Sequence, residues 1–210
     1  VLLIADEIMT GMGRTGKPFC VEHWGVQPDI ITSAKALSGG YSPVGAAIAS
    51  DTIIETILKG SGVFGHGHTY NANPTTAAAV TATIRFMKKN NIFENCAKRG
   101  EQFGKLLRGM LDIPFVGDVR GKGLMWGVEL VEDKETRKPF DPARKAAALV
   151  TAECMERGLV IYPGTGQIDG VEGDQFLIAP PLIVTEEQVE EIARRLRAGL
   201  EAAAEKLARK

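Results

Sequence analysis

Short apolar runs alternate with longer stretches of helical periodicity along the chain, and this order predicts an α/β protein. A continuous apolar run is typical of a strand in a parallel sheet that is covered on both faces. Apolar positions spaced by three or four residues predict amphipathic helices instead. The strands predicted in the first half cover residues 1–5, 29–32 and 44–49. The helices predicted there cover residues 51–58, capped by Asp51, residues 74–89, capped by Asn73, and residues 93–111.

The pattern changes near residue 93, and we place a boundary there between a domain of residues 1–92 and a domain of residues 93–210. One predicted strand of the second domain alternates apolar and polar residues, as a strand with one solvated face does. The strands predicted in this domain cover residues 113–119, 123–131, 159–162 and 176–179. Its later helices are predicted to run from Asp141-Pro142 to Arg157 and onward from the capping box Thr185-Glu186-Glu187-Gln188.

Composition and charge exclude several classes of function. The 210 residues carry a net charge of −1, which gives no reason to expect a nucleic acid or an anionic membrane as partner. The three cysteines are scattered, which predicts a reducing, cytoplasmic location, and no membrane-spanning apolar run is present. The apolar strand at Val1–Ala5 has no methionine or polar arm before it. We therefore expect the chain to be a fragment that starts inside a larger α/β domain.

Lys35 is the first candidate for chemistry, because it follows a predicted apolar strand and precedes the paired glycines Gly39-Gly40. Ammonium groups are seldom placed at the end of an inner strand without a reason. Desolvation lowers the pKa of a lysine, and a neutral amine can attack a carbonyl carbon to form a Schiff base. A lone lysine is more often a snorkelling or salt-bridged residue, so other groups must support the chemical interpretation.

Asp6 ends the first predicted strand, at the position where α/β sheets usually bind ligands. The following loop, residues 11–16, matches the pattern Gly-x-Gly-x-x-Gly that also occurs in dinucleotide-binding folds. That interpretation requires a helix that opens at the glycines, whereas Lys17-Pro18 follows at once and proline disfavours helical backbone before it. A flexible glycine loop beside a site fits these residues better, and a nucleotide-binding oxidoreductase remains the weaker alternative.

A second glycine-rich loop, residues 60–69, contains His66 and His68 and ends at Thr69. No third ligand with suitable spacing accompanies the histidines, so we predict no metal site. Backbone N–H groups of such a loop and the Thr69 hydroxyl could bind a phosphate. Pyridoxal 5'-phosphate has an aldehyde for Lys35, a basic ring nitrogen for Asp6 and a phosphate for Thr69.

Many ordered motifs make the chain resemble the class III aminotransferases, enzymes of fold type I that use pyridoxal 5'-phosphate. The resemblance extends over essentially the whole chain. The motifs that carry it are Leu3-Ile4-Ala5-Asp6-Glu7-Ile8, Thr10-Gly11, Gly13-Arg14-Thr15-Gly16, Pro28-Asp29-Ile30, Ala34-Lys35, Gly39-Gly40, His68-Thr69-Tyr70, Asn73-Pro74, Arg120-Gly121-Lys122-Gly123-Leu124 and Ala179-Pro180-Pro181-Leu182.

The resemblance implies a role for each of four residues. Lys35 would hold the cofactor in a Schiff base and then move the proton during catalysis, while Asp6 would keep the pyridine nitrogen protonated. Ile8 would pack against the ring, and Thr69 would bind the phosphate across the interface of a homodimer with a shared active site. The fold implied is the later half of a mostly parallel large domain, followed by a small α+β domain.

The resemblance leaves the substrate open. Several relatives have an arginine, which binds a substrate carboxylate, at the position of Leu177, and residues 164–175 contain no arginine either. This favours an amine or omega-amino acid as donor, with a keto acid such as pyruvate as acceptor. The acidic residues Asp169, Glu172 and Asp174 are expected to form a solvated loop. The alternatives are a mutase or decarboxylase of the same family and a noncatalytic, truncated dimerisation module.

Overall fold

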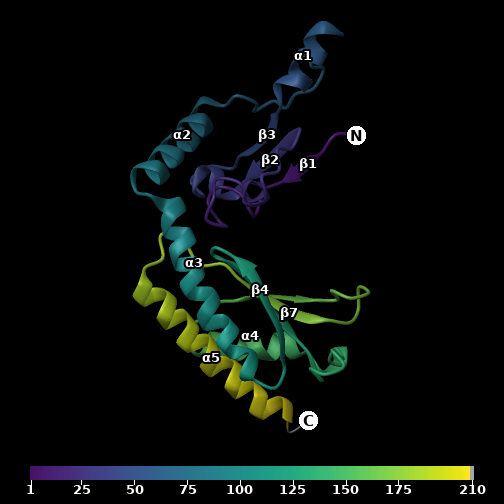
Figure 1. Ribbon diagram of the computed structural model, residues 1–210, viewed down its shortest axis with the longest axis vertical. Coiled ribbons are helices and arrows are strands. Elements are labelled where there is room, and N and C mark those ends of the chain that lie inside the picture. The colour runs from purple at the N-terminus through teal and green to yellow at the C-terminus, as the bar shows by residue number, and fades with distance from the viewer. Residues whose placement is uncertain (209–210) are drawn as a thin grey trace. The chain divides into compact units, whose positions relative to one another are not determined.

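The structure is a computed structural model that describes residues 1–208, and its chain divides into two compact units (Figure 1). The N-terminal unit covers Val1–Asn95 and the C-terminal unit begins at Cys96. The boundary predicted at residue 93 stays a prediction. The candidate residues Asp6, Lys35 and Thr69 all lie in the N-terminal unit.

The N-terminal unit contains a three-stranded sheet in the order β1-β2-β3. The strands are β1 (Ile4–Asp6), β2 (Ile30–Ala34) and β3 (Gly45–Ala49), so all three predicted strands are confirmed. β1 pairs with β2 in parallel, with Asp6 opposite Thr32, whereas β3 runs antiparallel to β2. Residues 1–4 are exposed within this chain, so whether the first apolar run is covered on both faces stays a prediction.

The helices of this unit follow the predicted pattern with one correction. They are the 3₁₀ helices η1 (Cys20–Trp24) and η2 (Lys35–Ser38), then α1 (Asp51–Lys59) and α2 (Pro74–Lys89), and finally α3 (Ile92–Arg108), which continues into the C-terminal unit. The Asn73 side chain caps α2 by accepting hydrogen bonds from Thr75 N and Thr76 N, as predicted. Ser50, and not Asp51, is the N-cap of α1.

The first glycine loop is a largely buried turn, and its expected flexibility stays a prediction. Gly11 and Gly13 are both buried, and a Cβ atom added to Gly13 would lie 2.7 Å from a ring carbon of Phe93. The φ angle of Gly13 is +85°, which glycine adopts at little cost. No helix opens at the glycines, since the next element is the 3₁₀ helix η1. The loop therefore lacks the helix N-terminus on which dinucleotide binding depends.

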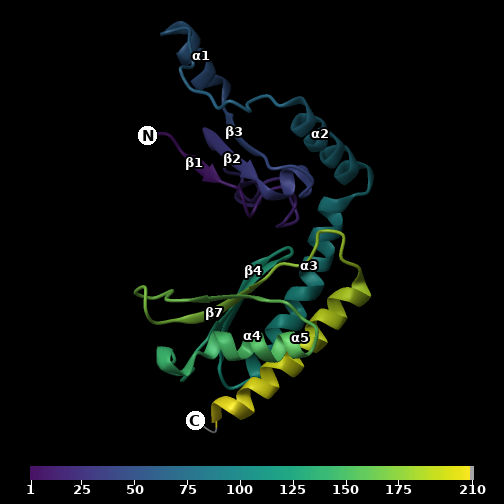
Figure 2. The same ribbon diagram turned by 180° about the vertical axis from the view of Figure 1, so that it is seen from behind.

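The C-terminal unit contains a four-stranded antiparallel sheet in the order β4-β5-β7-β6. Its strands are β4 (Val116–Lys122), β5 (Met125–Leu130), β6 (Tyr162–Thr165) and β7 (Asp174–Ile178). Helices α3, α4 (Ala146–Glu156) and α5 (Glu186–Ala208) lie against this sheet (Figure 2). The buried residues Trp126, Val128 and Leu130 alternate along β5, as predicted for a one-sided strand. β6 begins at Tyr162, so the strand predicted over residues 159–162 starts and ends about three residues later than expected.

The start of α4 also differs from the prediction. Asp141-Pro142 begins only a 3₁₀ turn, η4 (Pro142–Arg144), because Lys145 then adopts left-handed backbone with φ +51°. α4 starts after this break, and Asp174 of β7 accepts a hydrogen bond of 3.0 Å from Ala147 N in its first turn. Asp174 is therefore buried and structural, which corrects the expectation of a wholly solvated acidic loop.

α4 and α5 approach one another closely, because a glycine lies at their contact. A Cβ atom added to Gly199 would lie 2.7 Å from Sγ of Cys154. Burial raises the pKa of the Cys154 thiol to about 11, so the thiol stays protonated at neutral pH. The buried carboxylate of Glu153 forms ion pairs with Lys206 of α5 and Arg157. Within this unit, α5 begins with the predicted capping box between Thr185 and Gln188.

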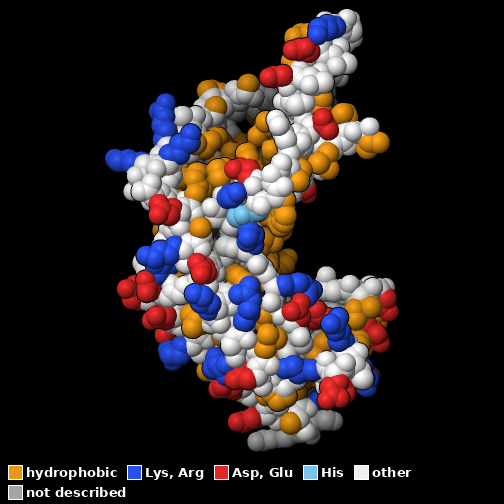
Figure 3. All heavy atoms as spheres, in the orientation of Figure 1, with side chains coloured by type: hydrophobic (Ala, Val, Ile, Leu, Met, Phe, Trp, Pro, Cys, Tyr) orange, Lys and Arg blue, Asp and Glu red, His pale blue; other side chains and the backbone are white. Residues whose placement is uncertain are grey.

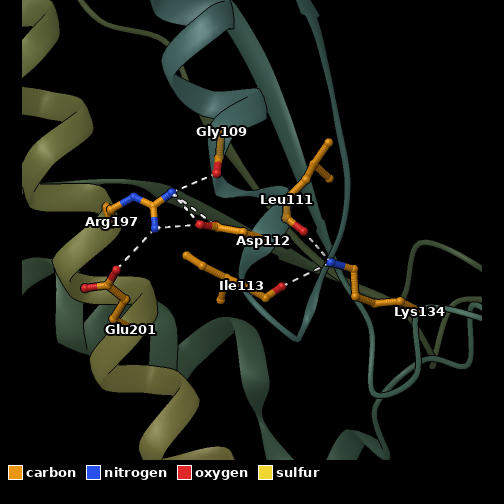
Figure 4. A network of polar contacts seen from close by, with 7 residues as sticks. All are labelled: Gly109, Leu111, Asp112, Ile113, Lys134, Arg197 and Glu201. Carbon is orange, nitrogen blue, oxygen red and sulfur yellow. Dashed lines mark hydrogen bonds and ion pairs between the residues drawn. The ribbon is translucent and has the colours of Figure 1, made fainter.

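Two cationic side chains bind the turn between α3 and β4 (Figure 4). Arg197 of α5 donates hydrogen bonds to Gly109 O and to the carboxylate of Asp112, at 2.7 and 3.0 Å. Lys134 donates to Leu111 O at 2.5 Å and to Ile113 O at 3.2 Å. The carbonyls that follow the last turn of α3 are thereby satisfied by side chains, as the ends of helices require.

We expect Arg197→Ala to lower the melting temperature by about 2–4 °C, since the partly exposed ion pair contributes modestly and the Gly109 carbonyl also loses its donor. The Arg197 guanidinium lowers the pKa of Asp112 below its ordinary value. A carboxyl group with a lowered folded-state pKa stabilises the fold above its unfolded pKa and loses this effect as the pH falls through the folded pKa. The difference between variant and wild type should therefore shrink from pH 7 to about pH 3.

Arg194→Ala is the matched control for this measurement, because among residues 1–208 Arg194 pairs only with Glu191, one turn earlier in α5. Thermal denaturation followed by circular dichroism at both pH values gives the comparison. Equal losses in the two arginine variants, or a loss for Arg197→Ala that grows in acid, would contradict the assigned role of the network.

The surfaces of the two units differ in composition (Figure 3). Lys, Arg, Asp and Glu are interspersed over the visible face of the C-terminal unit, while hydrophobic side chains gather on the N-terminal unit. The large hydrophobic residues exposed near the chain start are Val1, Leu2, Leu3 and Ile4. Within residues 1–208, none of the helices combines the length and apolar character that crossing a membrane requires.

Candidate active site

The carboxyl ends of two adjacent parallel strands bring Asp6 and Lys35 to the same edge of the sheet. Asp6 is the last residue of β1, and Lys35 follows the last residue of β2 directly. Parallel pairing aligns these ends, since Asp6 lies opposite Thr32, three residues before the lysine. In open α/β sheets this edge is where ligands bind.

Lys35 carries an exposed amine on an unusual backbone. Its φ angle is +46°, in the left-handed region that residues other than glycine seldom adopt. Among residues 1–208, no hydrogen bond or ion pair of its Nζ is found, so the amine is available to a ligand. The sequence suggested a desolvated lysine, but within this chain the side chain is exposed.

The turn after Lys35 is anchored to α2 by a chain of hydroxyl groups. Ser38 Oγ donates to Ser42 O at 2.5 Å, and Ser42 Oγ lies 2.9 Å from Thr76 Oγ1 of α2. Gly39 follows with φ +63°, and a Cβ atom there would approach Oγ1 of Thr83 to 3.3 Å. The paired glycines thus let the chain turn close to α2, and the hydroxyl chain restricts the backbone that carries the lysine.

One oxygen of the Asp6 carboxylate is held by two donors of the chain. Oδ1 accepts hydrogen bonds from Ile8 N at 3.0 Å and from Thr32 Oγ1 at 3.3 Å. For Oδ2, no partner occurs among the described residues, and the side chain is exposed. The Ile8 side chain is half-buried. Ile8 therefore contributes an apolar side chain at this edge as well as the backbone N–H that binds Asp6.

Glu7, the second of the two carboxylates that follow the first apolar strand, is buried. Its carboxylate accepts hydrogen bonds from Thr10 Oγ1 at 2.5 Å and from Val21 N at 2.8 Å. Its own N–H donates to Thr32 O at 2.9 Å. Glu7 therefore fixes the first glycine loop to the end of β1. Its position directly after an apolar strand was a usable signal, because a buried carboxylate must find partners.

Thr69 lies in the loop between α1 and α2 and is exposed. In the part of the chain that the structure describes, its hydroxyl takes part in no hydrogen bond, so the structure does not join Thr69 to Asp6 or Lys35. The rings of His66 and His68 meet edge to face, with centroids 5.0 Å apart. Across residues 1–208, no group of three or more His, Cys, Asp or Glu side chains is arranged to hold a metal ion.

Leu177 lies on β7, in the C-terminal unit, and is half-buried. It pairs with Gly127 of β5 on one side and with Tyr162 of β6 on the other. In the adjoining loop, the backbone N–H groups of Val171 and Glu172 donate to Asp169 and lower the pKa of its carboxyl group. These backbone bonds give Asp169 a structural role in the turn.

Comparison with known proteins places these features in context. The family model described as Aminotransferase class-III matches residues 1–200. An uncharacterized aminotransferase of Bacillus subtilis, YodT, is 44% identical over 193 residues, which are 91% of this chain and 44% of that protein.

Solved structures give the same picture. A transaminase from the marine bacterium Virgibacillus is 34% identical with a TM-score of 0.92, and the match covers 98% of this chain and 46% of that one. An (S)-enantioselective omega-transaminase from Thermomicrobium roseum is 35% identical with a TM-score of 0.87 over 97% of this chain and 44% of that one. The chain spans less than half the length of each of these proteins.

Proposed function

Because the chain belongs to the class III aminotransferases, we propose that the protein transfers an amino group from an amine or omega-amino acid to a keto acid such as pyruvate. Enzymes of this family depend on pyridoxal 5'-phosphate, which supplies an electron-accepting ring to the reaction. The observation that supports the proposal best is the placement of Asp6 and Lys35 at the carboxyl ends of adjacent parallel strands.

The residues at this edge fit the cofactor by the chemistry of their free groups. Lys35 offers an exposed amine that the described residues leave without a partner, and Asp6 offers the oxygen Oδ2. An amine suits an aldehyde carbon, and a carboxylate suits a protonated ring nitrogen. The fixed backbone on either side, at Ile8 and in the turn anchored to α2, orients both groups before any ligand binds.

Each of the four predicted site residues keeps its proposed role. Lys35 would bind the cofactor covalently through Nζ and, when released, would move the substrate proton. Asp6 would hold a proton on the ring nitrogen through its carboxylate, and Ile8 would cover the ring with its apolar side chain. Thr69 would donate its hydroxyl to a phosphate in the other subunit of a homodimer, which agrees with its exposure and its lack of a partner among the described residues.

The donor class is supported by the side chain at position 177. Leucine offers no charge to a substrate carboxylate at this position, whereas arginine binds carboxylates through two parallel hydrogen bonds. Donors without a carboxylate, such as primary amines, are therefore better suited to a leucine at this position than ornithine, 4-aminobutyrate or acetylornithine. That one structural relative is an omega-transaminase is consistent with this choice. The cytoplasmic location and the homodimer stay predictions.

A donor panel on the full-length protein tests the proposal. Primary amines, omega-amino acids and ornithine are each supplied with pyruvate or 2-oxoglutarate, and the keto or aldehyde product and the new amino acid are quantified. We expect the rate of amino transfer to pyruvate to be about tenfold or more higher with primary amines than with ornithine. The reason is that leucine at position 177 cannot form the ion pair that arginine forms with a substrate carboxylate. Release of CO₂ or of an isomer without a new amino acid would favour the decarboxylase or mutase instead. Cofactor binding without any turnover would favour the noncatalytic module.

A further inference from the structure

Thr32 holds the carboxylate of Asp6 from the neighbouring strand. Its hydroxyl lies 3.3 Å from Asp6 Oδ1, and an ionised carboxylate only accepts hydrogen bonds, so the threonine is the donor. The hydroxyl is found in no other hydrogen bond among the described residues. Neither the sequence pattern nor the family resemblance singled out this residue.

The position of this hydroxyl is fixed by the sheet. Thr32 lies opposite Asp6 in the parallel register, and its carbonyl oxygen accepts a hydrogen bond of 2.9 Å from Glu7 N. Threonine is branched at Cβ, which restricts χ1 to few rotamers. Backbone register and rotamer together therefore present the hydroxyl to one particular carboxylate oxygen.

We infer that Thr32 is a positioning residue, which binds Asp6 Oδ1 so that Oδ2 is presented to the ring nitrogen of pyridoxal phosphate. The inference rests on the proposed function. With Ile8 N and Thr32 Oγ1 both on Oδ1, rotation of the carboxylate about its Cβ–Cγ bond would break two hydrogen bonds. Preorganised groups of this kind avoid reorientation when the ligand binds. The threonine acts through Asp6 and itself touches no reacting atom.

Three substitutions at position 32 separate the hydroxyl from the shape of the side chain. Thr32→Val keeps the branched shape and removes the donor, Thr32→Ala removes both, and Thr32→Ser keeps the donor. Thr151→Val is the matched control, because Thr151 is also half-buried and its hydroxyl bonds, among the residues that the structure describes, only to Ala147 O within α4. Asp6→Asn gives the reference for complete loss of the carboxylate.

The first readout is the dissociation constant of pyridoxal phosphate from the full-length protein, measured by fluorescence titration. We expect an increase of about three- to tenfold for Thr32→Val and Thr32→Ala, and a change below about twofold for Thr32→Ser and Thr151→Val. The second readout is the NMR shift of a ¹⁵N-labelled ring nitrogen in the bound cofactor. In Thr32→Val the shift should move part of the way toward that of Asp6→Asn, while Thr32→Ser should match wild type.

The outcomes distinguish this inference from the proposed function. A changed ring-nitrogen signal in Asp6→Asn with a wild-type signal in both Thr32→Val and Thr32→Ala overturns the role of Thr32 and leaves the proposed function intact. Equal losses in Thr32→Val and Thr151→Val also overturn it, since they indicate a general effect on stability. A wild-type protein that binds no pyridoxal phosphate overturns both. Should valine prevent folding, the comparison of alanine with serine still decides the result.

Discussion

Lys35→Ala is expected to reduce turnover of the full-length protein by about 10³-fold or more and to abolish covalent attachment of the cofactor. The substitution removes an amine that is exposed and unpartnered among the described residues, so few contacts of the fold are lost with it. Loss of activity would then follow from the missing nitrogen and not from unfolding. Lys35→Arg should be equally inactive, because a guanidinium keeps its charge and cannot serve as a neutral nucleophile.

Borohydride reduction followed by mass spectrometry provides the measurement, together with a rate assay. Wild type should gain the mass of one reduced cofactor on a peptide that contains Lys35, and the variant should not. Lys59→Ala is the matched control, since Lys59 is exposed and, in the described part of the chain, pairs only with Glu55 within α1. Cofactor trapped on Lys35→Ala would remove Lys35 from the proposed mechanism.

Gly100→Ala is expected to destabilise the fold by about 3 kcal/mol, which is the second large effect. A Cβ atom on Gly100 would lie 2.3 Å from two backbone atoms of Gly123, in the connection between β4 and β5. Within a free helix the same substitution would stabilise by up to about 1 kcal/mol, because alanine has the higher helix propensity. The steric effect should prevail, since backbone atoms cannot move aside as the end of a flexible side chain can.

Gly109→Ala gives the control for this effect. Gly109 lies at the start of the 3₁₀ helix η3 (Gly109–Asp112), and a Cβ atom there would meet no atom within 4 Å. Its free energy of unfolding should stay within about 0.5 kcal/mol of wild type in urea denaturation. Equal stability of Gly100→Ala and Gly109→Ala would contradict the close packing of α3 against the β4–β5 hairpin.

The sequence predicted those elements whose signals are local. Asn73 and Pro74 determine the start of α2, because a side-chain cap and a restricted φ angle act within one turn. Asp141-Pro142 carries a similar signal, yet α4 starts later. Its first turn is capped by Asp174, which arrives from a strand 27 residues further along the chain. A tertiary contact of this kind leaves no local pattern at the helix start, so sequence reasoning placed the boundary wrongly.

In the candidate site, too, the residues with a local signal were predictable and the tertiary contacts were not. Asp6 and Lys35 could be found from their positions after apolar strands, because strand ends are visible in the hydrophobic pattern. The hydrogen bond from Thr32 to Asp6 depends on the parallel register of β1 and β2, which the pattern does not determine. Thr69 could be named from the glycine-rich loop that it ends, because such loops suit a phosphate. Its proposed role across a dimer interface came from family resemblance alone, since a single chain carries no information on a second subunit.

The left-handed backbone of Lys35 implies that, under the proposed function, stability and activity place opposite demands on position 35. Glycine adopts positive φ freely, whereas a lysine there carries a conformational cost of about 1 kcal/mol or more. A search for thermostable variants that ranks residues by backbone fit would therefore rank Lys35 among its first targets for replacement by glycine. Under the proposed function, such a search should hold position 35 constant, because glycine lacks the amine that we propose binds the cofactor.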